Sequence, residues 1–260
     1  MIVVDAEILN ILRQPQTGSP LRLIRQETEE WLQADGGQRY TDDGGIIRFL
    51  KDDAASGSNL RYQRMYDRFA PLYDAITRGY ARIRNGGEKN RVMQYLSALK
   101  IADNDLVVEI SVGTGRNIKY LNPAARYFGV DISLGMLRTC ARRMKKIGRE
   151  IALIQAEAES LPFRDEAFDV VYSAGGFNFF NDRDKAVREM LRVAKSGTLL
   201  MISDETEKVR QAYRRGTLTG QFYSREQIAN PAEIVAQYCK EYEYEEVCGG
   251  ELYALTFRKP

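Results

Sequence analysis

Two carboxylates beside a glycine turn predict a site for a nucleoside. One apolar run ends near Glu109 and leads into a turn that contains Gly113 and Gly115, and a second apolar run ends at Asp131. Glycines let the backbone pass close to a ligand, and an acid that ends the second strand of such a unit can accept hydrogen bonds from a ribose diol. A strand, a glycine turn and a helix start in this order indicate a doubly wound α/β domain.

The spacing of the glycines argues against the dinucleotide-binding version of this motif. That version has a third small residue three positions after the second glycine, where this chain has Ile118. Glu109 is also not a feature of dinucleotide sites. Taken alone, the two glycines could also form an ordinary tight turn without a ligand. The sequence that follows them therefore decides between the two interpretations.

The glycine turn with Asp131 is the first of four sequence blocks, and three more blocks follow it. They are Ala156–Phe163, Phe168–Ser173 and Leu191–Gly197. In this order and at these distances, the four blocks resemble class I S-adenosylmethionine-dependent methyltransferases, especially the small-molecule branch that includes ubiquinone and menaquinone biosynthesis enzymes. The resemblance covers roughly residues 61–200.

The chain departs from the family pattern at two loop positions. Ser111 stands where the family usually has the first glycine of its loop, and Thr198 follows Gly197 where a second glycine is common. A serine is small enough to keep the cofactor loop plausible.

The resemblance implies S-adenosylmethionine as the cofactor and assigns residues to its parts. Glu109 and the glycine loop would face the amino acid end, Asp131 would bind the ribose hydroxyls, and Glu157 would accept from the adenine amino group. The implied cofactor-binding residues are Tyr66, Tyr73, Glu109, Ser111, Gly113, Gly115, Asn117, Asp131, Ile132, Met136, Glu157, Ala158 and Ser173.

The methyl acceptor is expected where the fourth and fifth parallel strands end. Asn178, between two phenylalanines, is predicted to orient it. Methyl transfer depends on alignment and exclusion of water more than on a strong base. If a base is used, the candidates are Asp204, Glu205 and Tyr213. Residues 204–231 fit either an exposed amphipathic helix or a basic, aromatic lid over the acceptor.

Composition excludes several chemistries. The chain has no histidine, which excludes histidine bases, triads and metal sites. Three widely spaced cysteines, Cys140, Cys239 and Cys248, predict free thiols in a reducing, cytoplasmic compartment. No apolar run approaches the about 20 residues of a membrane span, the N-terminus has no signal-peptide pattern, and a net charge of +2 gives no strong nucleic-acid footprint.

Residues 1–51 predict a small β-rich module. The run Leu12–Leu21, with Tyr40 and Gly45–Ile47, resembles the zinc-ribbon module that is sometimes fused to methyltransferases. Its four metal-binding cysteines would fall at Gln14, Thr17, Ala34 and Gly37. Because none of these residues suits a zinc site, we expect a module without metal that is stabilised by apolar packing or by a partner, and a homodimer through it is left open.

Hydrophobic periodicity predicts the elements that position these residues. Helices are expected at 6–12, 89–99, 116–121, 133–146 and 183–194, with one or two more at 61–81 after a polar linker at 52–59. Strands are expected at 106–110, 127–131, 151–155, 168–173 and 198–203, with a terminal hairpin at 242–248 and 252–257. The predicted fold class is α/β: a doubly wound, seven-stranded, mostly parallel Rossmann-like methyltransferase sheet over residues 61–260. The N-terminal module over residues 1–51 joins it through a polar linker.

Three functions remain open at this point. The leading hypothesis is methyl transfer from S-adenosylmethionine to a small-molecule acceptor, at an oxygen, nitrogen or carbon atom that the sequence does not identify. A non-catalytic regulatory or partner subunit that binds this cofactor is the alternative. A tRNA or protein methyltransferase is a third hypothesis; against it, Ser173–Gly176 stands where amine-methylating enzymes carry an Asn-Pro-Pro-Tyr-type motif.

Overall fold

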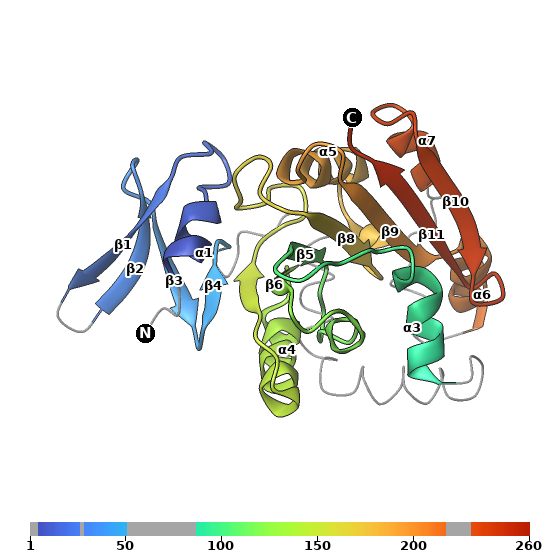
Figure 1. Cartoon of the computed structure of the whole chain (residues 1–260), viewed down its shortest axis with the longest axis horizontal. Coiled ribbons are helices and arrows are strands. Elements are labelled where there is room, and N and C mark those ends of the chain that lie inside the picture. The colour runs from blue at the N-terminus through green and yellow to red at the C-terminus, as the bar shows by residue number, and fades with distance from the viewer. Residues whose placement is uncertain (1–4, 27–28, 51–86, 217–229) are drawn as a thin grey trace.

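A computed structural model of the chain describes residues 5–26, 29–50, 87–216 and 230–260 (Figure 1). The helices are α1 (Ala6–Ile11), α3 (Glu88–Leu96), η1 (Ile118–Tyr120), α4 (Leu134–Ile147), η2 (Phe177–Phe179), α5 (Arg183–Val193), α6 (Glu207–Gly216) and α7 (Pro231–Val235), where η marks a 3₁₀ turn. The strands are β1 (Leu21–Gln26), β2 (Glu29–Ala34), β3 (Arg39–Asp43), β4 (Ile46–Arg48), β5 (Leu106–Ile110), β6 (Arg126–Asp131), β7 (Ala152–Gln155), β8 (Val170–Ala174), β9 (Leu199–Glu205), β10 (Tyr242–Val247) and β11 (Leu252–Arg258).

These strands join in one sheet with the order β1-β2-β3-β4-β7-β6-β5-β8-β9-β11-β10 (Figure 1). The central strands from β4 to β9 pair in parallel, and the outer pairs on both sides are antiparallel. The predicted α/β class is therefore confirmed. The sheet is larger than the predicted seven strands because β4 pairs in parallel with β7 and continues the sheet into the N-terminal strands.

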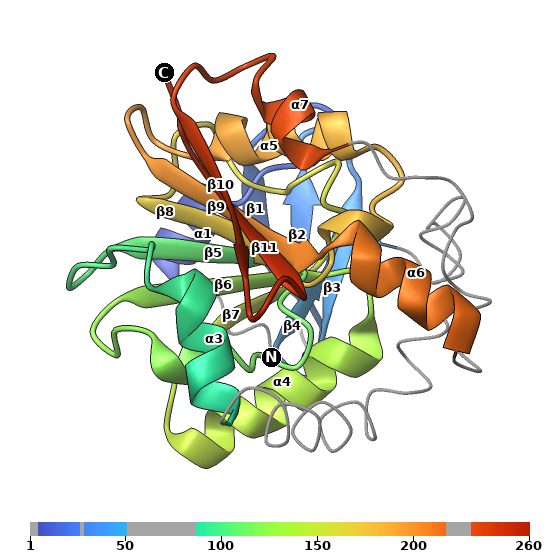
Figure 2. The same ribbon diagram turned by 90° about the vertical axis from the view of Figure 1, so that its right-hand side faces the viewer.

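Helices cover both faces of the central sheet, as Figure 2 shows: α5 and α7 lie on one side, and α3 and α4 on the other. Apolar side chains accordingly form two buried clusters. The cluster under α5 extends without a break into the N-terminal strands, since Leu12 and Leu32 belong to it together with Phe163 and Phe168. Residues 5–50 thus share a sheet and a core with the rest of the chain.

Most predicted elements appear within a residue or two of their expected bounds. The helix expected at 116–121 is only the short turn η1, because Asn117 directs its side chain to Glu109 and caps nothing. Strand β3 was not predicted, since its residues Arg39–Asp43 are mostly polar. The linker at 52–59 and the predicted helices at 61–81 lie outside the described residues.

Side-chain hydrogen bonds join the two turns of the N-terminal module where the zinc-ribbon resemblance would place a metal. Gln14 donates its amide to Gln16 and Gln38, at 2.6 Å in each case, and accepts from the backbone of Thr17. Its side chain is buried, with 2% exposure. In the part of the chain that the structure describes, no group of three or more His, Cys, Asp or Glu residues is placed to hold a metal. The amide of Gln14 therefore links the two turns.

This arrangement predicts that Gln14→Ala destabilises the N-terminal strands. The substitution removes the hydrogen bonds that this buried amide makes to Gln16, Thr17 and Gln38, each worth about 0.5–1.5 kcal/mol of unfolding free energy. Urea unfolding monitored by Trp31 fluorescence measures the loss, and the exposed neighbour Gln16→Ala is the matched control with a smaller expected effect. Equal stabilities of Gln14→Ala and the wild type would contradict the role of this amide.

Candidate functional site

Residues from four separate segments line one cavity at the carboxyl edge of the parallel strands, where α/β sheets bind ligands. This Asp131 cavity is lined by Ile110, Ser111, Val130, Asp131, Ile132, Ala156, Glu157, Ala158, Glu159 and Phe180. Five of the predicted cofactor residues, Ser111, Asp131, Ile132, Glu157 and Ala158, are among them. The other five lining residues were not predicted as cofactor contacts, although Glu159 lies only two positions after Glu157.

The carboxylate of Asp131 ties together the loops that follow β5 and β6. It accepts the backbone N–H of Gly113 at 2.8 Å and that of Ser133 at 2.9 Å. A carboxylate only accepts hydrogen bonds, and this one is part of the cavity wall. A pair of ribose hydroxyls suits such a group.

Ser111 lies in the left-handed backbone region, with φ of +63°, at the position where the family pattern has glycine. This conformation costs a residue with a Cβ about 1–2 kcal/mol. Space for its side chain comes from Gly176 in the loop after β8, because a Cβ added at Gly176 would lie 2.3 Å from Ser111 Oγ. The departure at Ser111 is therefore accommodated by a glycine in the loop that follows the neighbouring strand β8.

Gly115 and Met136 have packing roles in the structure. Gly115 has φ of +69°, and a Cβ there would lie 2.5 Å from Cys140 Sγ, so this glycine lets the loop pack on α4. Met136, in the first turn of α4, is 3% exposed and is not among the residues that line the Asp131 cavity. Their contacts with a cofactor stay predictions.

A buried hydrogen-bond network lies behind the glycine loop. Asn117 donates to Glu109 at 2.5 Å, Tyr172 donates to the other oxygen of Glu109 at 2.9 Å, and Tyr95 donates to Asn117 at 2.9 Å. Glu109 is 1% exposed. Burial raises the pKa of Glu109 to about 8, although the two hydrogen bonds oppose that shift. Both oxygens of Glu109 are thus used to hold the loop in place, and its predicted contact with the amino acid end of a cofactor stays untested.

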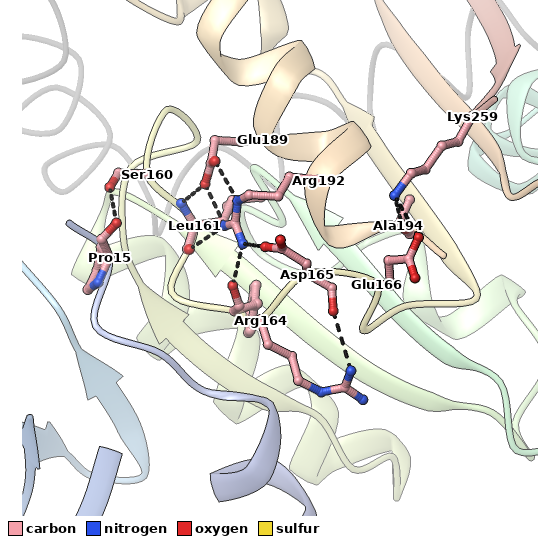
Figure 3. A network of polar contacts seen from close by, with 11 residues as sticks. Pro15, Ser160, Leu161, Arg164, Asp165, Glu166, Glu189, Arg192, Ala194 and Lys259 are labelled. Carbon is pink, nitrogen blue, oxygen red and sulfur yellow. Dashed lines mark hydrogen bonds and ion pairs between the residues drawn. The ribbon is translucent and has the colours of Figure 1, made fainter. Parts of the chain in front are cut away.

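Two segments that are far apart in the sequence, α5 and the turn after α1, hold the loop that carries Glu157–Ser160 (Figure 3). Glu189 of α5 accepts from the backbone of Leu161, and Arg192 donates to the Leu161 carbonyl at 3.0 Å. On the other side, Ser160 donates to the Pro15 carbonyl at 3.4 Å. Backbone bonds also join this loop to the end of α1, from Arg13 to Pro162 and from Arg164 to Ile11.

A second hollow, the Tyr253 cleft, lies beyond the end of β9. Its volume is about 540 Å³. It is lined by Asn178, Glu205, Thr206, Glu207, Lys208, Arg210, Asn230, Pro231, Glu233, Tyr244, Glu246 and Tyr253. Because Phe180 lines the Asp131 cavity and Asn178 lines this cleft, the η2 segment lies between the two hollows.

Asp204 lies behind the wall of the cleft, at 2% exposure and outside its lining. It accepts the backbone N–H groups of Asn178 and Glu205, at 2.8 and 2.7 Å. Burial raises the pKa of Asp204 to about 6, and those hydrogen bonds and Arg210 oppose the shift. The geometry makes Asp204 a positioning group for Asn178, whereas its predicted role as a base stays untested.

The remaining predicted residues are placed as follows. Tyr66 and Tyr73 lie outside the described residues. Tyr213 belongs to α6, and its side chain is outside the description. Ser173 is fully buried in β8, and its hydroxyl has no hydrogen-bond partner among the residues that the structure covers. Arg210 is 2% exposed, and its guanidinium lies 3.6 Å from the carboxylate of Glu207. The alternative of an exposed helix over residues 204–231 expected a solvated arginine, and Arg210 is buried instead.

Comparison with known protein families agrees with this geometry. A family profile described as a methyltransferase domain matches residues 108–202. Demethylmenaquinone methyltransferase of Thermobifida fusca is 32% identical over 142 residues, which cover 54% of this chain and 59% of that protein. The chain therefore spans about three fifths of the length of this curated relative.

Solved structures with low sequence identity share the fold. The cyclase SpnF has a TM-score of 0.61 at 17% identity, covering 79% of this chain and 97% of that chain. A methyltransferase dependent on S-adenosylmethionine from Thermotoga maritima has a TM-score of 0.58 at 19% identity, covering 76% of this chain and 99% of that chain. These neighbours show the fold, and the domain match shows that residues 108–202 are similar to a methyltransferase domain.

Replacement of Asp131 should weaken the cofactor site. Asp131→Ala removes charge-assisted hydrogen bonds worth roughly 1.5–3 kcal/mol each, so the Kd for S-adenosylhomocysteine should rise at least about tenfold. Calorimetry measures this change, with the exposed Asp103→Ala variant as the control. A folded Asp131→Ala protein that binds as tightly as the wild type would contradict the assignment.

The raised pKa of Glu109 predicts a pH dependence of stability. Its pKa of about 8 exceeds the ordinary value of 4.5, so the folded state binds the proton more tightly and the unfolding free energy falls as pH rises between these values. Glu109→Gln should make this fall shallower, without abolishing it, because Asp204 contributes in the same sense at lower pH. Urea unfolding at pH 5 and pH 8 tests the slope, with exposed Glu150→Gln as the control. An unchanged slope in Glu109→Gln would refute the prediction.

Proposed function

We propose that this chain carries a class I S-adenosylmethionine-dependent methyltransferase domain of the ubiquinone and menaquinone biosynthesis branch. On this premise, the protein transfers a methyl group from S-adenosylmethionine to a small-molecule acceptor. The observation that carries the proposal is the Asp131 cavity. It gathers Ser111, Asp131, Ile132 and Glu157 from separate turns at the carboxyl edge of the sheet.

The chemistry of the cavity wall fits an adenosyl group. Asp131 offers a carboxylate to a ribose diol, Ile132 and Phe180 offer apolar faces to a planar base, and Glu157 offers an acceptor to an exocyclic amine. When bound, S-adenosylmethionine supplies a methyl group activated by a positive sulfonium. The chain's own contribution is then to orient the two reactants and exclude water, which alone can be worth roughly 7–11 kcal/mol.

The Tyr253 cleft is the proposed acceptor site. Asn178 reaches it from η2, and its side-chain amide donates to the Glu205 carbonyl at 2.9 Å, which holds the residue at the wall. Tyr244, which is 39% exposed, stacks on the buried Tyr253 with ring centroids 5.5 Å apart and offers an aromatic surface. The relatives are named for quinone acceptors, so a quinol ring is the first acceptor to test.

Finer features of the organisation are also proposals. We propose that residues 61–260 form the methyltransferase unit, with strands β5 to β11 as its seven strands, and that residues 1–51 are a ribbon-like module without metal. A homodimer through this module and a cytoplasmic location belong to the same proposal. Within the ranges that the structure describes, no helix has the length and apolar character that a membrane crossing requires.

Calorimetry and a methyl-transfer assay test the function. The wild type should bind S-adenosylmethionine and S-adenosylhomocysteine at micromolar Kd and should not bind NAD. It should then methylate a short-chain demethylmenaquinol. Asn178→Ala should lower the methylation rate at least about tenfold while the Kd for S-adenosylhomocysteine stays within twofold, because the residue lines only the cleft.

Two outcomes would redirect the proposal. Absence of binding to both adenosyl ligands would refute it. Tight binding without methylation of any acceptor in a panel of quinols, phenols and amines would favour the non-catalytic alternative, which the serine at a loop-glycine position motivates. Binding of total tRNA that weakens with salt would instead favour a nucleic-acid substrate.

A further inference from the structure

The N-terminal strands reach the Asp131 cavity through the end of β7. Strand β4 pairs with β7 in the register Ile46–Leu153, Ile47–Ile154 and Arg48–Gln155. The pairing continues one step further, where the N–H of Phe49 donates to the carbonyl of Gln155 at 2.9 Å. Ala156, the residue that follows the end of β7, lines the cavity. The last pair of this register therefore lies directly at the cavity wall.

Side chains make a continuous hydrogen-bond relay from this pair. Arg48 Nε donates to Gln155 Oε1 at 3.0 Å, and Gln155 Nε2 donates to the carbonyl of Ile132 at 3.1 Å. Gln155 is 2% exposed, so water does not readily replace either bond. The relay crosses from β4, over β7, to the turn after β6.

The chemistry of the partners fixes the orientation of the Gln155 amide. A guanidinium only donates hydrogen bonds and a carbonyl only accepts them. The amide oxygen must therefore face Arg48, and the amide nitrogen must face Ile132. The flipped amide would set NH₂ against a cation and oxygen against oxygen, which are two repulsive contacts. Arg48 thus determines which end of Gln155 meets the cavity wall.

The relay ends on a peptide group that also holds Asp131. The carbonyl of Ile132 and the N–H of Ser133 belong to one planar peptide unit. Gln155 holds the carbonyl end, and the N–H end donates to Asp131 Oδ1 at 2.9 Å. A rotation of this peptide would therefore move Ile132 and remove one of the two backbone bonds that orient the Asp131 carboxylate.

We propose that Arg48, through Gln155, is a positioning residue of the nucleoside site, so that the N-terminal strands complete a site whose contact residues all lie in the methyltransferase domain. The proposal rests on the proposed function in naming the adenosyl group as the ligand. It assigns the N-terminal module a part in cofactor affinity. Arg48 itself does not line the cavity.

The test uses matched substitutions in the full chain. Arg48→Met keeps the aliphatic stem and removes the donor, so the Kd for S-adenosylhomocysteine should rise about tenfold, as expected for the loss of a buried hydrogen-bond partner. Arg48→Lys keeps a donor and should stay within about threefold of the wild type. Gln155→Glu keeps the acceptor for Arg48 but cannot donate to Ile132, so it should weaken binding as Arg48→Met does.

A second contact between the N-terminal strands and the rest of the chain supplies the control. Arg138 of α4 pairs with Asp43, the last residue of β3, at 2.6 Å, and neither residue lines the cavity. Arg138→Gln removes this contact without touching the relay and should leave the Kd within twofold. An equal loss of affinity in Arg138→Gln and Arg48→Met would show general loosening of the module and overturn the proposal.

A measurement without ligand separates this inference from the proposed function. Amide hydrogen exchange of the peptide that contains Ser133 should be at least about tenfold faster in Arg48→Met than in the wild type and in Arg138→Gln. Wild-type protein that binds no adenosyl ligand would refute the proposed function, and the exchange rates would still decide the relay. The inference would be overturned if the exchange rate at Ser133 were the same in Arg48→Met and in the wild type. It would also be overturned if the wild type bound S-adenosylhomocysteine and Arg48→Met bound it with the same Kd.

Discussion

The parallel pairing of β4 with β7 is the contact on which the organisation of this chain depends. A strand at the edge of a sheet leaves backbone N–H and C=O groups without partners, and β7 would be such an edge if the sheet ended there. The pairing of Ile46–Arg48 with Leu153–Gln155 satisfies these groups. It also makes the N-terminal strands continuous with the sheet that carries the site, so their side chains can act on that site.

The site depends on buried polar groups that do not line it. Glu109 holds the loop behind the Asp131 cavity, and Asp204 holds Asn178 at the wall of the Tyr253 cleft. Both carboxylates are almost fully buried, and burial raises the pKa of each. A carboxyl group kept in such a place costs folding free energy. The backbone order that it imposes next to each hollow is the compensating gain.

The two hollows carry different parts of the proposed chemistry. The Asp131 cavity has the features that suit a nucleoside, whereas the Tyr253 cleft combines carboxylates, amides and stacked tyrosines that would contact an acceptor. A fold shared with both methyltransferases and a cyclase does not itself select the reaction. In the proposed function, the choice of reaction therefore depends on which acceptor binds in the cleft and on how η2 orients it.

Local patterns in the sequence determined the order of the elements, the glycine turn and the acid that ends β6, because hydrophobic period and turn chemistry act between near neighbours. They could also indicate, through the family resemblance, which residues would meet in the Asp131 cavity. The joining of β4 to β7, the hydrogen bonds from Arg48 through Gln155 to Ile132 and those of the Gln14 amide were decided only by tertiary structure. These contacts join residues far apart in the chain, and no periodicity records which distant donor will meet which acceptor.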